Sequence, residues 1–503
     1  MLKRLLAKTH IPKWLFFVLL LVLVLRLPSF FEPYHYGDES IYLTLGQGIR
    51  QGVPLYKSLH DNKPPLLYIT AAVAGNLFWF KVILATWLLA TILIFRKFVQ
   101  KLFLKNIKLE KAAVWIFALL TSLPLFEGNI ANAELFMIGP TIGAFYLLLF
   151  SQKSIKNLLL SGVLFSISTL FKVPALFDIF AIVSFWLIYS YQKKTELIKV
   201  LKNLSLVFIG FVTPILLTIL WYYFRGAFRE YLVAAFLQNV GYLSTWKDPA
   251  VEEASFLVKN GSLFFKFGLV VVGNIILCLK KKVLKKEFVF LTAWILFSSF
   301  AVSLSERPYP HYFVQVLPPV AILFSLFLTD KSLLQSLALI PLGLAFLVPF
   351  YYKFWYYPTS SYYLRFVKLA TGQLAKEDYL NSFDSRLSRN YQVADLVNKI
   401  TNRKDRIFIW GDSANLYALT RRLPVIKYAA DYHIRDFSSN KEVAGLLSAK
   451  SPTVIIVLPE APLFTELRLF LANQYLLLAQ VEGVEIYKIL KPEVKSAIIT
   501  NFF

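Results

Sequence analysis

Long apolar runs recur along most of this chain, and they constrain its fold more than any other feature. Examples are WLFFVLLLVLVL from Trp14, GLVVVGNIILCL from Gly268 and LALIPLGLAFLVPF from Leu337. Runs of this kind approach the roughly 20 apolar residues with which a helix crosses a bilayer. Only 17% of the residues are charged and 57% are hydrophobic, whereas soluble domains carry about 25% charged residues. The water-soluble class is therefore excluded, and we expect a polytopic helical membrane protein.

The hydropathy pattern predicts about eleven transmembrane helices. The expected spans are 12–30, 80–96, 112–126, 135–150, 157–171, 174–190, 204–223, 263–279, 287–304, 311–328 and 333–351. Basic clusters lie at the N-terminus and at Arg96–Lys111, Lys193–Lys202 and Lys280–Lys286, and the positive-inside bias places such clusters in the cytoplasm. Leu66–Phe78 could be a further span, but that span would place the basic segment Arg96–Lys111 on the extracytoplasmic side. We therefore favour about eleven spans, which keep this segment in the cytoplasm.

This topology divides the chain into two parts. Residues 1–351 form the predicted transmembrane domain, in which 31–79 are a first external loop, and residues 352–503 form an extracytoplasmic domain. The second part alternates short β-rich runs with helical stretches: strands are expected at RIFIW from Arg406, PTVIIVLP from Pro452 and VEIYKI from Val484. This alternation is typical of a small α/β domain. We expect a multi-pass protein of the plasma (inner) membrane with a cytoplasmic N-terminus.

Charge and cysteine content exclude other classes of partner and site. The chain has 54 Lys and Arg against 30 Asp and Glu, a formal charge of +24. Because the basic residues cluster between apolar runs, anionic lipid head groups explain this excess better than nucleic acid, and no nucleic-acid partner is expected. The single cysteine, Cys278, excludes disulfides within the chain and cysteine-based metal sites.

The first external loop holds the densest group of candidate functional residues. In the segment YGDESIYLTLGQGIRQGVPLYKSLHDNKPPLLY from Tyr36, Asp38 and Glu39 are adjacent acids beside the membrane. They suit a general base or a cation site, although Asp38 could equally cap the amphipathic helix 39–50. Lys63 precedes two prolines, which stiffen the chain and direct the ammonium. Such a lysine suits a phosphate, and its alternative role is that of an interfacial anchor.

The loop also resembles a known family. The pattern D-E-x-x-Y, then G-x-G-I-x-x-G-x-x-x-Y and K-P-P-L-x-Y resembles the first external loop of the GT-C membrane glycosyltransferases, the group of dolichyl-phosphate-mannose protein mannosyltransferases and bacterial aminoarabinose lipid A transferases. Two further segments are similar to the same group: STLFKVPA with Lys172, and ERPYPHYFVQVLPP with Arg307, His311 and Tyr312. Together these matches cover most of the membrane part.

The resemblance implies the GT-C fold and an inverting transfer of a hexose or pentose from a polyprenyl-phosphate-linked donor to a hydroxyl acceptor. That acceptor could be a lipid, a glycan or a protein. The resemblance further implies that Asp38 takes the proton of the acceptor hydroxyl and that Glu39 holds Asp38 or the acceptor. Cations stabilise the charge that builds on the leaving phosphate. The implied phosphate-binding residues are Lys63, Lys172, Arg307 and His311, and the implied cavity-lining residues are Tyr42, Glu134 and Tyr312.

No metal or other cofactor is predicted. The aminoarabinose transferases carry an acidic residue just before the loop lysine, whereas Asn62 stands there in this chain. His35, His60 and His311 lack the spacing of a metal motif. The rival function is a transporter or flippase for lipid-linked saccharides, which would place ionisable groups at mid-depth and carry paired broken helices. In this sequence the acids and lysines concentrate at one membrane face, which favours the enzyme.

Overall fold

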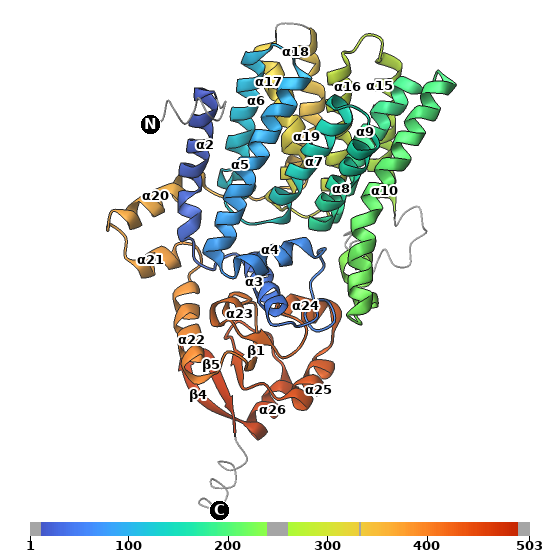
Figure 1. Ribbon diagram of the computed structural model, residues 1–503. Helices are drawn as coiled ribbons and strands as arrows, with labels where there is room; N and C mark the ends of the chain where they lie inside the picture. Colours follow the sequence, from blue (N-terminus) through green and yellow to red (C-terminus); the bar gives the residue numbers. More distant parts are fainter. Residues whose placement is uncertain (1–11, 239–259, 331–332, 491–503) are drawn as a thin grey trace, which may run out of the picture.

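The computed structural model describes residues 12–238, 260–330 and 333–490 as a helical bundle that carries a smaller α/β domain at one end (Figure 1). The first helix, α2 (Lys13–Arg26), begins at the end of the bundle remote from that domain. The short helices α3 (Gly37–Arg50) and α4 (Leu66–Ala74) lie between the bundle and the domain. The first loop and the α/β domain therefore share one end of the molecule.

Within the described residues, eight helical segments are long and apolar enough to cross a membrane. They are Lys13–Phe31 with α2, α5 (Leu77–Leu102), α7 (Ala133–Phe150), Val173–Ser190 with α9 (Leu176–Ser190), α10 (Lys194–Phe224), α15 (Gly261–Lys280), α16 (Lys286–Ser303) and Pro310–Thr329 with α17 (Leu317–Thr329). Shorter apolar helices are α8 (Ile155–Phe171) and the segment Gln335–Tyr351, which contains α19 (Leu339–Tyr351) and the end of α18 (Leu333–Leu337). α6 (Ile107–Leu120) has 14 residues and carries three charges in its first half. Each predicted span overlaps one of these segments, which confirms the predicted class of a polytopic helical membrane protein.

Leu66–Phe78, the alternative extra span, does not cross the bundle. Leu66–Ala74 forms α4, a helix of nine residues, and nine residues extend only about 14 Å at 1.5 Å per residue. Gly75 ends α4 in the left-handed conformation with a φ of 72°. Asn76 then caps α5 by accepting a hydrogen bond from the backbone N–H of Trp79 at 3.0 Å.

Two glycines let α8 and α10 approach backbone to backbone. A Cβ atom added to Gly162 would lie 2.0 Å from the carbonyl oxygen of Val207, and one added to Gly210 would lie 2.1 Å from that of Leu159. Small residues at a crossing are the usual means by which helices pack closely in a membrane, where packing rather than water exclusion drives association.

Enlarging Gly162 should therefore force α8 and α10 apart. We expect Gly162→Leu to lower the free energy of unfolding by about 1–3 kcal/mol, the range for overpacked interiors, measured by denaturant titration in mild detergent. Gly343→Leu on α19 is the matched control, because a Cβ there meets nothing within 4 Å. Equal stability of the two variants would show that the crossing tolerates a side chain.

The C-terminal domain is built on a five-stranded sheet in the order β2-β1-β3-β5-β4. The strands are β1 (Arg406–Trp410), β2 (Leu423–Pro424), β3 (Val454–Val457), β4 (Tyr475–Val481) and β5 (Val484–Ile489). β1 pairs in parallel with β2 and β3, whereas β5 is antiparallel to both β3 and β4. The three predicted strands are confirmed as β1, β3 and β5, and the sequence analysis missed β2 and β4.

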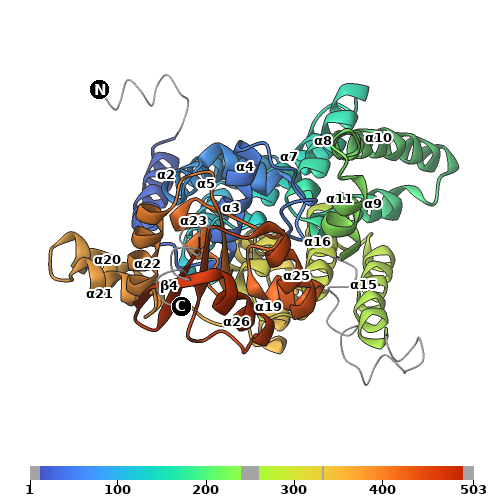
Figure 2. The ribbon, with the colours of Figure 1, turned by 90° about the horizontal axis from the view of Figure 1, so that it is seen from below.

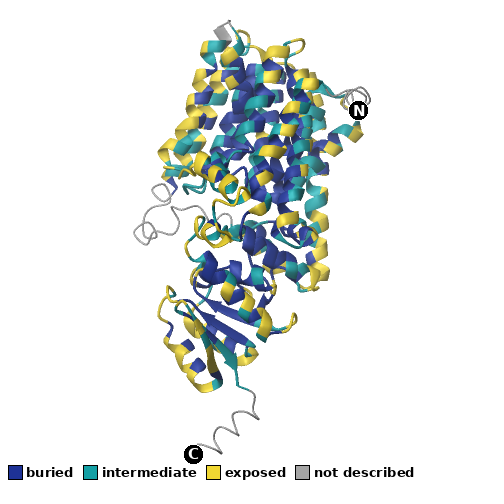
Figure 3. Cartoon of the chain, turned by 90° about the vertical axis from the view of Figure 1, so that its left-hand side faces the viewer, coloured by how far each residue is buried: buried dark blue, intermediate teal, exposed yellow. Residues whose placement is uncertain are grey.

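Helices connect and cover these strands. They are α22 (Leu387–Ile400), α23 (Asn415–Thr420), α24 (Asp431–Phe437), α25 (Asn440–Lys450) and α26 (Thr465–Gln474). Two earlier helices, α20 (Thr359–Ala370) and α21 (Lys376–Asn381), lie beside α2 rather than on the sheet (Figure 1). α23 packs against α3, and the view from below shows the two close together (Figure 2). Buried residues run from the middle of the bundle through α3 into the sheet, while exposed residues collect on the outer helices (Figure 3).

The domain also bonds to the first loop through main-chain and side-chain groups. The backbone N–H of His60 donates to the carbonyl oxygen of Lys427 at 2.7 Å, and Asn415 donates from Nδ2 to the carbonyl oxygen of Tyr34 at 3.0 Å. These bonds fix the loop against a domain that lies far away in the sequence.

Candidate active site

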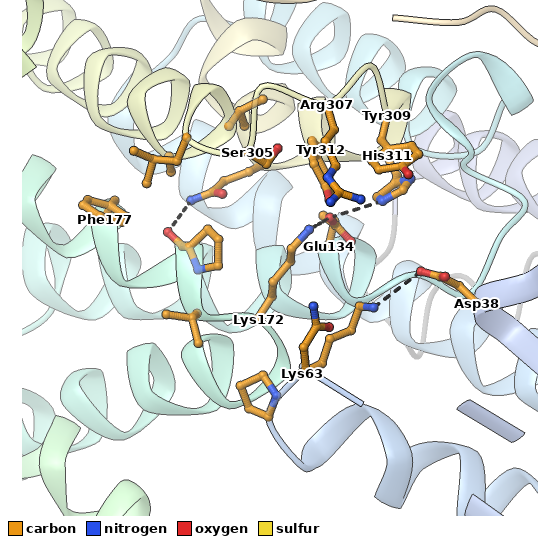
Figure 4. A pocket seen from close by; sticks show the side chains of 18 of the residues that line it. Asp38, Lys63, Glu134, Lys172, Phe177, Ser305, Arg307, Tyr309, His311 and Tyr312 are labelled. Carbon is orange, nitrogen blue, oxygen red and sulfur yellow. Dashed lines mark hydrogen bonds and ion pairs between the residues drawn. The ribbon is translucent and has the colours of Figure 1, made fainter. Parts of the chain in front are cut away.

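A cavity of about 1320 Å³ lies where the first loop, the bundle and the α/β domain meet. Seven of the nine residues singled out in the sequence line it: Asp38, Lys63, Glu134, Lys172, Arg307, His311 and Tyr312. Figure 4 shows Asp38 and Lys63 on one side and Lys172, Glu134, Arg307 and His311 across from them. The structure thus brings together segments that are far apart in the chain. Of the other two residues, Tyr42 contacts Asp38, and Glu39 turns away.

Asp38 stands in the first turn of α3, where a carboxylate is favoured by the helix dipole. Its Oδ2 accepts a hydrogen bond from the hydroxyl of Tyr42 at 2.7 Å and lies 3.4 Å from Nζ of Lys63. Burial alone would raise the pKa of Asp38, but attraction to Lys63 and the Tyr42 hydrogen bond outweigh it and lower the pKa to about 2. Asp38 is therefore an ionised carboxylate at neutral pH.

Lys63 is positioned by its own main chain. The hydroxyl of Tyr56 donates to the Lys63 carbonyl oxygen at 2.8 Å, and the Lys63 N–H donates to the hydroxyl oxygen of Tyr68 at 3.1 Å. Both tyrosines are buried, and Pro64 and Pro65 follow directly. The Lys63 ammonium also lies 4.8 Å from the centre of the Tyr42 ring. The two tyrosine hydrogen bonds and the two prolines thus hold the main chain at Lys63.

Lys172 and His311 meet at Glu134 on the opposite wall. Lys172 follows the last residue of α8, and its Nζ forms an ion pair with Oε1 of Glu134. His311 places Nε2 3.8 Å from the same Glu134 oxygen. The Lys172 ammonium also lies 3.7 Å from the centre of the Tyr312 ring, which gives Tyr312 a direct role in positioning this cation.

Glu127 organises this wall from behind. It belongs to the segment EGNIANAELF, a second acidic stretch that the sequence places outside between two spans, where its carboxylates could line the cavity or serve helix capping around Asn132. The side chain of Glu127 is fully buried, and Oε2 accepts hydrogen bonds from the Tyr36 hydroxyl at 2.8 Å and from Asn132 at 3.0 Å, while contacting Nδ1 of His311. Burial alone would raise its pKa, but His311 and the donated hydrogen bonds lower it. Glu127 directly follows the short helical turn Pro124–Phe126.

Glu39 faces away from the cavity, into a buried polar network. Its Oε1 lies 2.7 Å from Nζ of Lys81 and accepts a hydrogen bond from the backbone N–H of Ala131 at 2.6 Å. Lys81 also contacts Glu32 Oε2 at 2.8 Å and donates to the carbonyl oxygen of Asn129 at 2.8 Å. This placement gives Glu39 the geometry of a residue that holds the start of α3, beside Asp38, rather than one that touches the acceptor.

Aromatic and aliphatic side chains of α9, α15 and α16 form a second wall of the same cavity. Its members are Phe177, Phe180, Leu263, Phe264, Phe267, Val270, Phe297 and Phe300. Phe180, Phe264 and Phe267 are among the exposed large apolar side chains. An apolar wall built from helices long enough to span a bilayer suits a hydrocarbon chain.

The α/β domain contributes the remaining polar wall, which the sequence analysis did not anticipate. Its cavity-lining residues are Asp412, Tyr432, His433, Arg435, Asp436 and Phe437, all but the first on α24. Asp61 of the first loop lies among them, with Oδ1 3.6 Å from Nε2 of His433. No local pattern in the sequence marked DYHIRDF as part of a site.

Asn62 lies beside Lys63 on the cavity wall and offers an amide side chain. Among the residues that the structure describes, no group of three or more His, Cys, Asp and Glu side chains could hold a metal ion.

Comparison with solved structures identifies the architecture. The crystal structure of ArnT from Cupriavidus metallidurans bound to undecaprenyl phosphate matches 95% of this chain and 98% of its own, with a TM-score of 0.57 and 12% identity. The apo structure of the same protein matches 96% and 98%, with a TM-score of 0.52 and 12% identity. The oligosaccharyltransferase AglB from Archaeoglobus fulgidus gives a TM-score of 0.41 at 12% identity, over 89% of this chain and 70% of AglB, too low to establish a common fold.

Sequence comparison adds one local match. The family model described as "Putative competence-induced protein Ccs4 C-terminal domain" matches residues 384–492, most of the α/β domain. No curated protein matches the sequence. The chain therefore has the GT-C fold, as its resemblance to the aminoarabinose lipid A transferases implied.

Proposed function

We propose that this chain is an integral membrane glycosyltransferase that moves a sugar from a polyprenyl-phosphate-linked donor to a hydroxyl acceptor, with inversion at the anomeric carbon. The observation that carries the proposal is one cavity in which the Asp38–Lys63 pair faces Lys172 and Arg307, beside an apolar wall. We further propose that this cavity opens on the extracytoplasmic side of the plasma membrane. The positions of the basic clusters support that orientation.

The donor has chemical partners along two walls of the cavity. Its phosphate suits Lys63, Lys172 and Arg307, with His311 as a hydrogen-bond partner, and its hydrocarbon chain suits the phenylalanine-rich wall of α9, α15 and α16. ArnT, which shares this fold, was crystallised with undecaprenyl phosphate. As the sugar leaves, negative charge builds on the phosphate, and fixed cations stabilise that charge more in the transition state than in the bound donor.

The acceptor hydroxyl is activated by Asp38 in this proposal. Asp38 removes the hydroxyl proton while the oxygen attacks the anomeric carbon from the side opposite the phosphate, so one bond forms as the other breaks. With Lys63 beside it, the Asp38 pKa of about 2 makes a weak base. A donor phosphate that draws the Lys63 ammonium toward itself removes part of this stabilisation and raises the basicity of Asp38. Donor binding thus prepares the base.

Transport of lipid-linked saccharides is the competing function. A carrier needs ionisable groups near the middle of its spans and paired broken helices. The charged residues that line this cavity come instead from the first loop, from segments beside helix ends and from the α/β domain. This distribution favours chemistry at one face of the membrane.

Removal of the Lys63 ammonium tests the donor site. We expect Lys63→Ala to weaken the binding of undecaprenyl phosphate by about 10- to 100-fold, because a charge-assisted hydrogen bond contributes about 1.5–3 kcal/mol. Binding is measured with the purified chain in lipid nanodiscs. The control is Lys57→Ala, which removes an exposed lysine from the same loop.

Two results would contradict the proposal. Unchanged affinity in Lys63→Ala would return Lys63 to the role of an interfacial anchor. Absence of saturable undecaprenyl phosphate binding by the wild type would favour the carrier or a scaffold without activity.

A further inference from the structure

The end of the cavity formed by the α/β domain differs in charge from the end that holds the proposed donor phosphate. We call its residues the polar end: Asp61, Asp412, Tyr432, His433, Arg435 and Asp436. Three of these six residues are carboxylates and one is a guanidinium, and Nη2 of that Arg435 lies 3.4 Å from Oδ2 of Asp431. The donor end carries three cations, Lys63, Lys172 and Arg307, against the two carboxylates of Asp38 and Glu134.

His433 shows that the polar end is more than a group of acids on a surface. Its side chain lines the cavity but is only 5% exposed. Nε2 faces Asp61 at 3.6 Å, whereas Nδ1 has no hydrogen-bond partner among the described residues. A buried polar atom without a partner costs free energy unless something completes its hydrogen bonding. A hydroxyl of a bound molecule would do so.

Burial keeps this imidazole neutral. It lowers the pKa of His433, and the attraction of Asp61 opposes that shift without overcoming it. A neutral imidazole carries one N–H, and the carboxylate of Asp61 favours that proton on Nε2, so Nδ1 is left as a hydrogen-bond acceptor. The imidazole therefore adds no positive charge to the polar end.

We propose that the polar end is the acceptor subsite and that it binds an uncharged or amine-bearing sugar. This inference rests on the proposed function and specifies its acceptor. Carboxylates accept hydrogen bonds from neighbouring sugar hydroxyls, His433 bonds a further hydroxyl, and Tyr432 supplies an aromatic surface. The excess of acids repels phosphate- or carboxylate-bearing acceptors, which confines anions to the donor end.

The position of the polar end relative to Asp38 and the donor end suits direct attack of an acceptor hydroxyl on the donor sugar. Asp61 is two residues from Lys63 and lines the same cavity as Asp38. A sugar held at the polar end would therefore direct a hydroxyl toward Asp38 and toward a donor sugar whose phosphate rests on Lys63, Lys172 and Arg307. The α/β domain and the first loop together would fix which hydroxyl reacts.

The experiment compares three trisaccharides of different charge, which serve as probes. Chitotriose is uncharged, the glucosamine trimer carries amines, and trigalacturonic acid carries carboxylates. Binding to the full-length chain in nanodiscs is followed by saturation-transfer NMR. We expect chitotriose and the glucosamine trimer to bind, and trigalacturonic acid to bind at least about fivefold more weakly.

Two variants locate the binding. We expect the double variant Asp412→Asn with Asp436→Asn to bind the glucosamine trimer at least about fivefold more weakly than the wild type does. The variant should also discriminate less between the glucosamine trimer and trigalacturonic acid. His433→Gln should weaken the binding of both chitotriose and the glucosamine trimer. Asp395→Asn is the control, because Asp395 pairs with Lys399 at the exposed surface of α22. Undecaprenyl phosphate affinity, measured on every variant, reports that the fold and the donor end are intact.

Three outcomes would overturn the proposal: equal or tighter binding of trigalacturonic acid, binding that all the variants retain, or no binding of any trimer. Each of these is separable from failure of the proposed function. Undecaprenyl phosphate binding by the wild type, in the same nanodiscs, tests the donor site without any trisaccharide present.

Discussion

Replacement of Asp38 by asparagine should reduce sugar transfer at least 100-fold, because a positioned general base contributes about 10²- to 10⁴-fold. The amide keeps the size of the carboxylate and can still accept the Tyr42 hydrogen bond, but it cannot take the acceptor proton. Transfer is measured as release of undecaprenyl phosphate from whichever lipid-linked sugar, in a panel of donors, the wild-type chain uses.

For the Asp38→Asn variant we expect the affinity for the donor phosphate to stay the same or to rise, although transfer falls. Asp38 lies 3.4 Å from Nζ of Lys63, so loss of its charge leaves the ammonium more available to phosphate. Undecaprenyl phosphate should therefore bind Asp38→Asn as tightly as the wild type, or more tightly. Transfer above about a tenth of the normal rate would refute the role of Asp38. Weaker donor binding would instead indicate that the loop had lost its shape.

Replacement of Lys81 by methionine should destabilise the protein by about 3–5 kcal/mol, the cost of leaving buried charges without their partner. Lys81 is fully buried and lies 2.8 Å from Glu32 and 2.7 Å from Glu39. Two carboxylates would lose their counter-charge inside the protein. The free energy of unfolding in mild detergent, from denaturant titration, measures the effect.

The control for this variant is Lys199→Met, which breaks an exposed pair with Glu196 and should cost at most about 1 kcal/mol. Adding Glu32→Gln and Glu39→Gln to Lys81→Met should recover part of the lost stability, because the uncompensated charges are then gone. A Lys81→Met protein within about 1 kcal/mol of the wild type would mean that water reaches this network in solution.

The helical spans could be predicted well because the bilayer imposes a simple requirement on sequence. A helix that crosses it needs about 20 apolar residues, and few other elements show such runs. α6 and α8, with 14 and 17 residues, still matched because their apolar stretches lie between basic segments and turns. In the α/β domain β4 was missed, since YLLLAQV directly follows a helix and has no turn residues to mark its start.

The candidate site was predictable only where one local segment carried it. Asp38 and Tyr42 are four residues apart on α3, so they share a face, and their contact follows from helix geometry. Adjacent residues on a helix point about 100° apart, so Asp38 and Glu39 do not both face the cavity. The sequence pattern did not reveal which of the two acids would face it. Glu127 could be noticed as part of an acidic segment between two spans, whereas His433 reaches the site through a contact with Asp61 across the chain, which no local pattern encodes.

The bond between the His60 N–H and the Lys427 carbonyl oxygen also has a consequence for how the protein is made. At about 5–20 residues per second, the ribosome completes the first loop tens of seconds before it produces the segment that docks on it. During synthesis the loop therefore waits beside the membrane without one of its supports. A chain that ended before α24 would lack the α/β wall of this cavity, so the cavity is complete only after that segment has been synthesised.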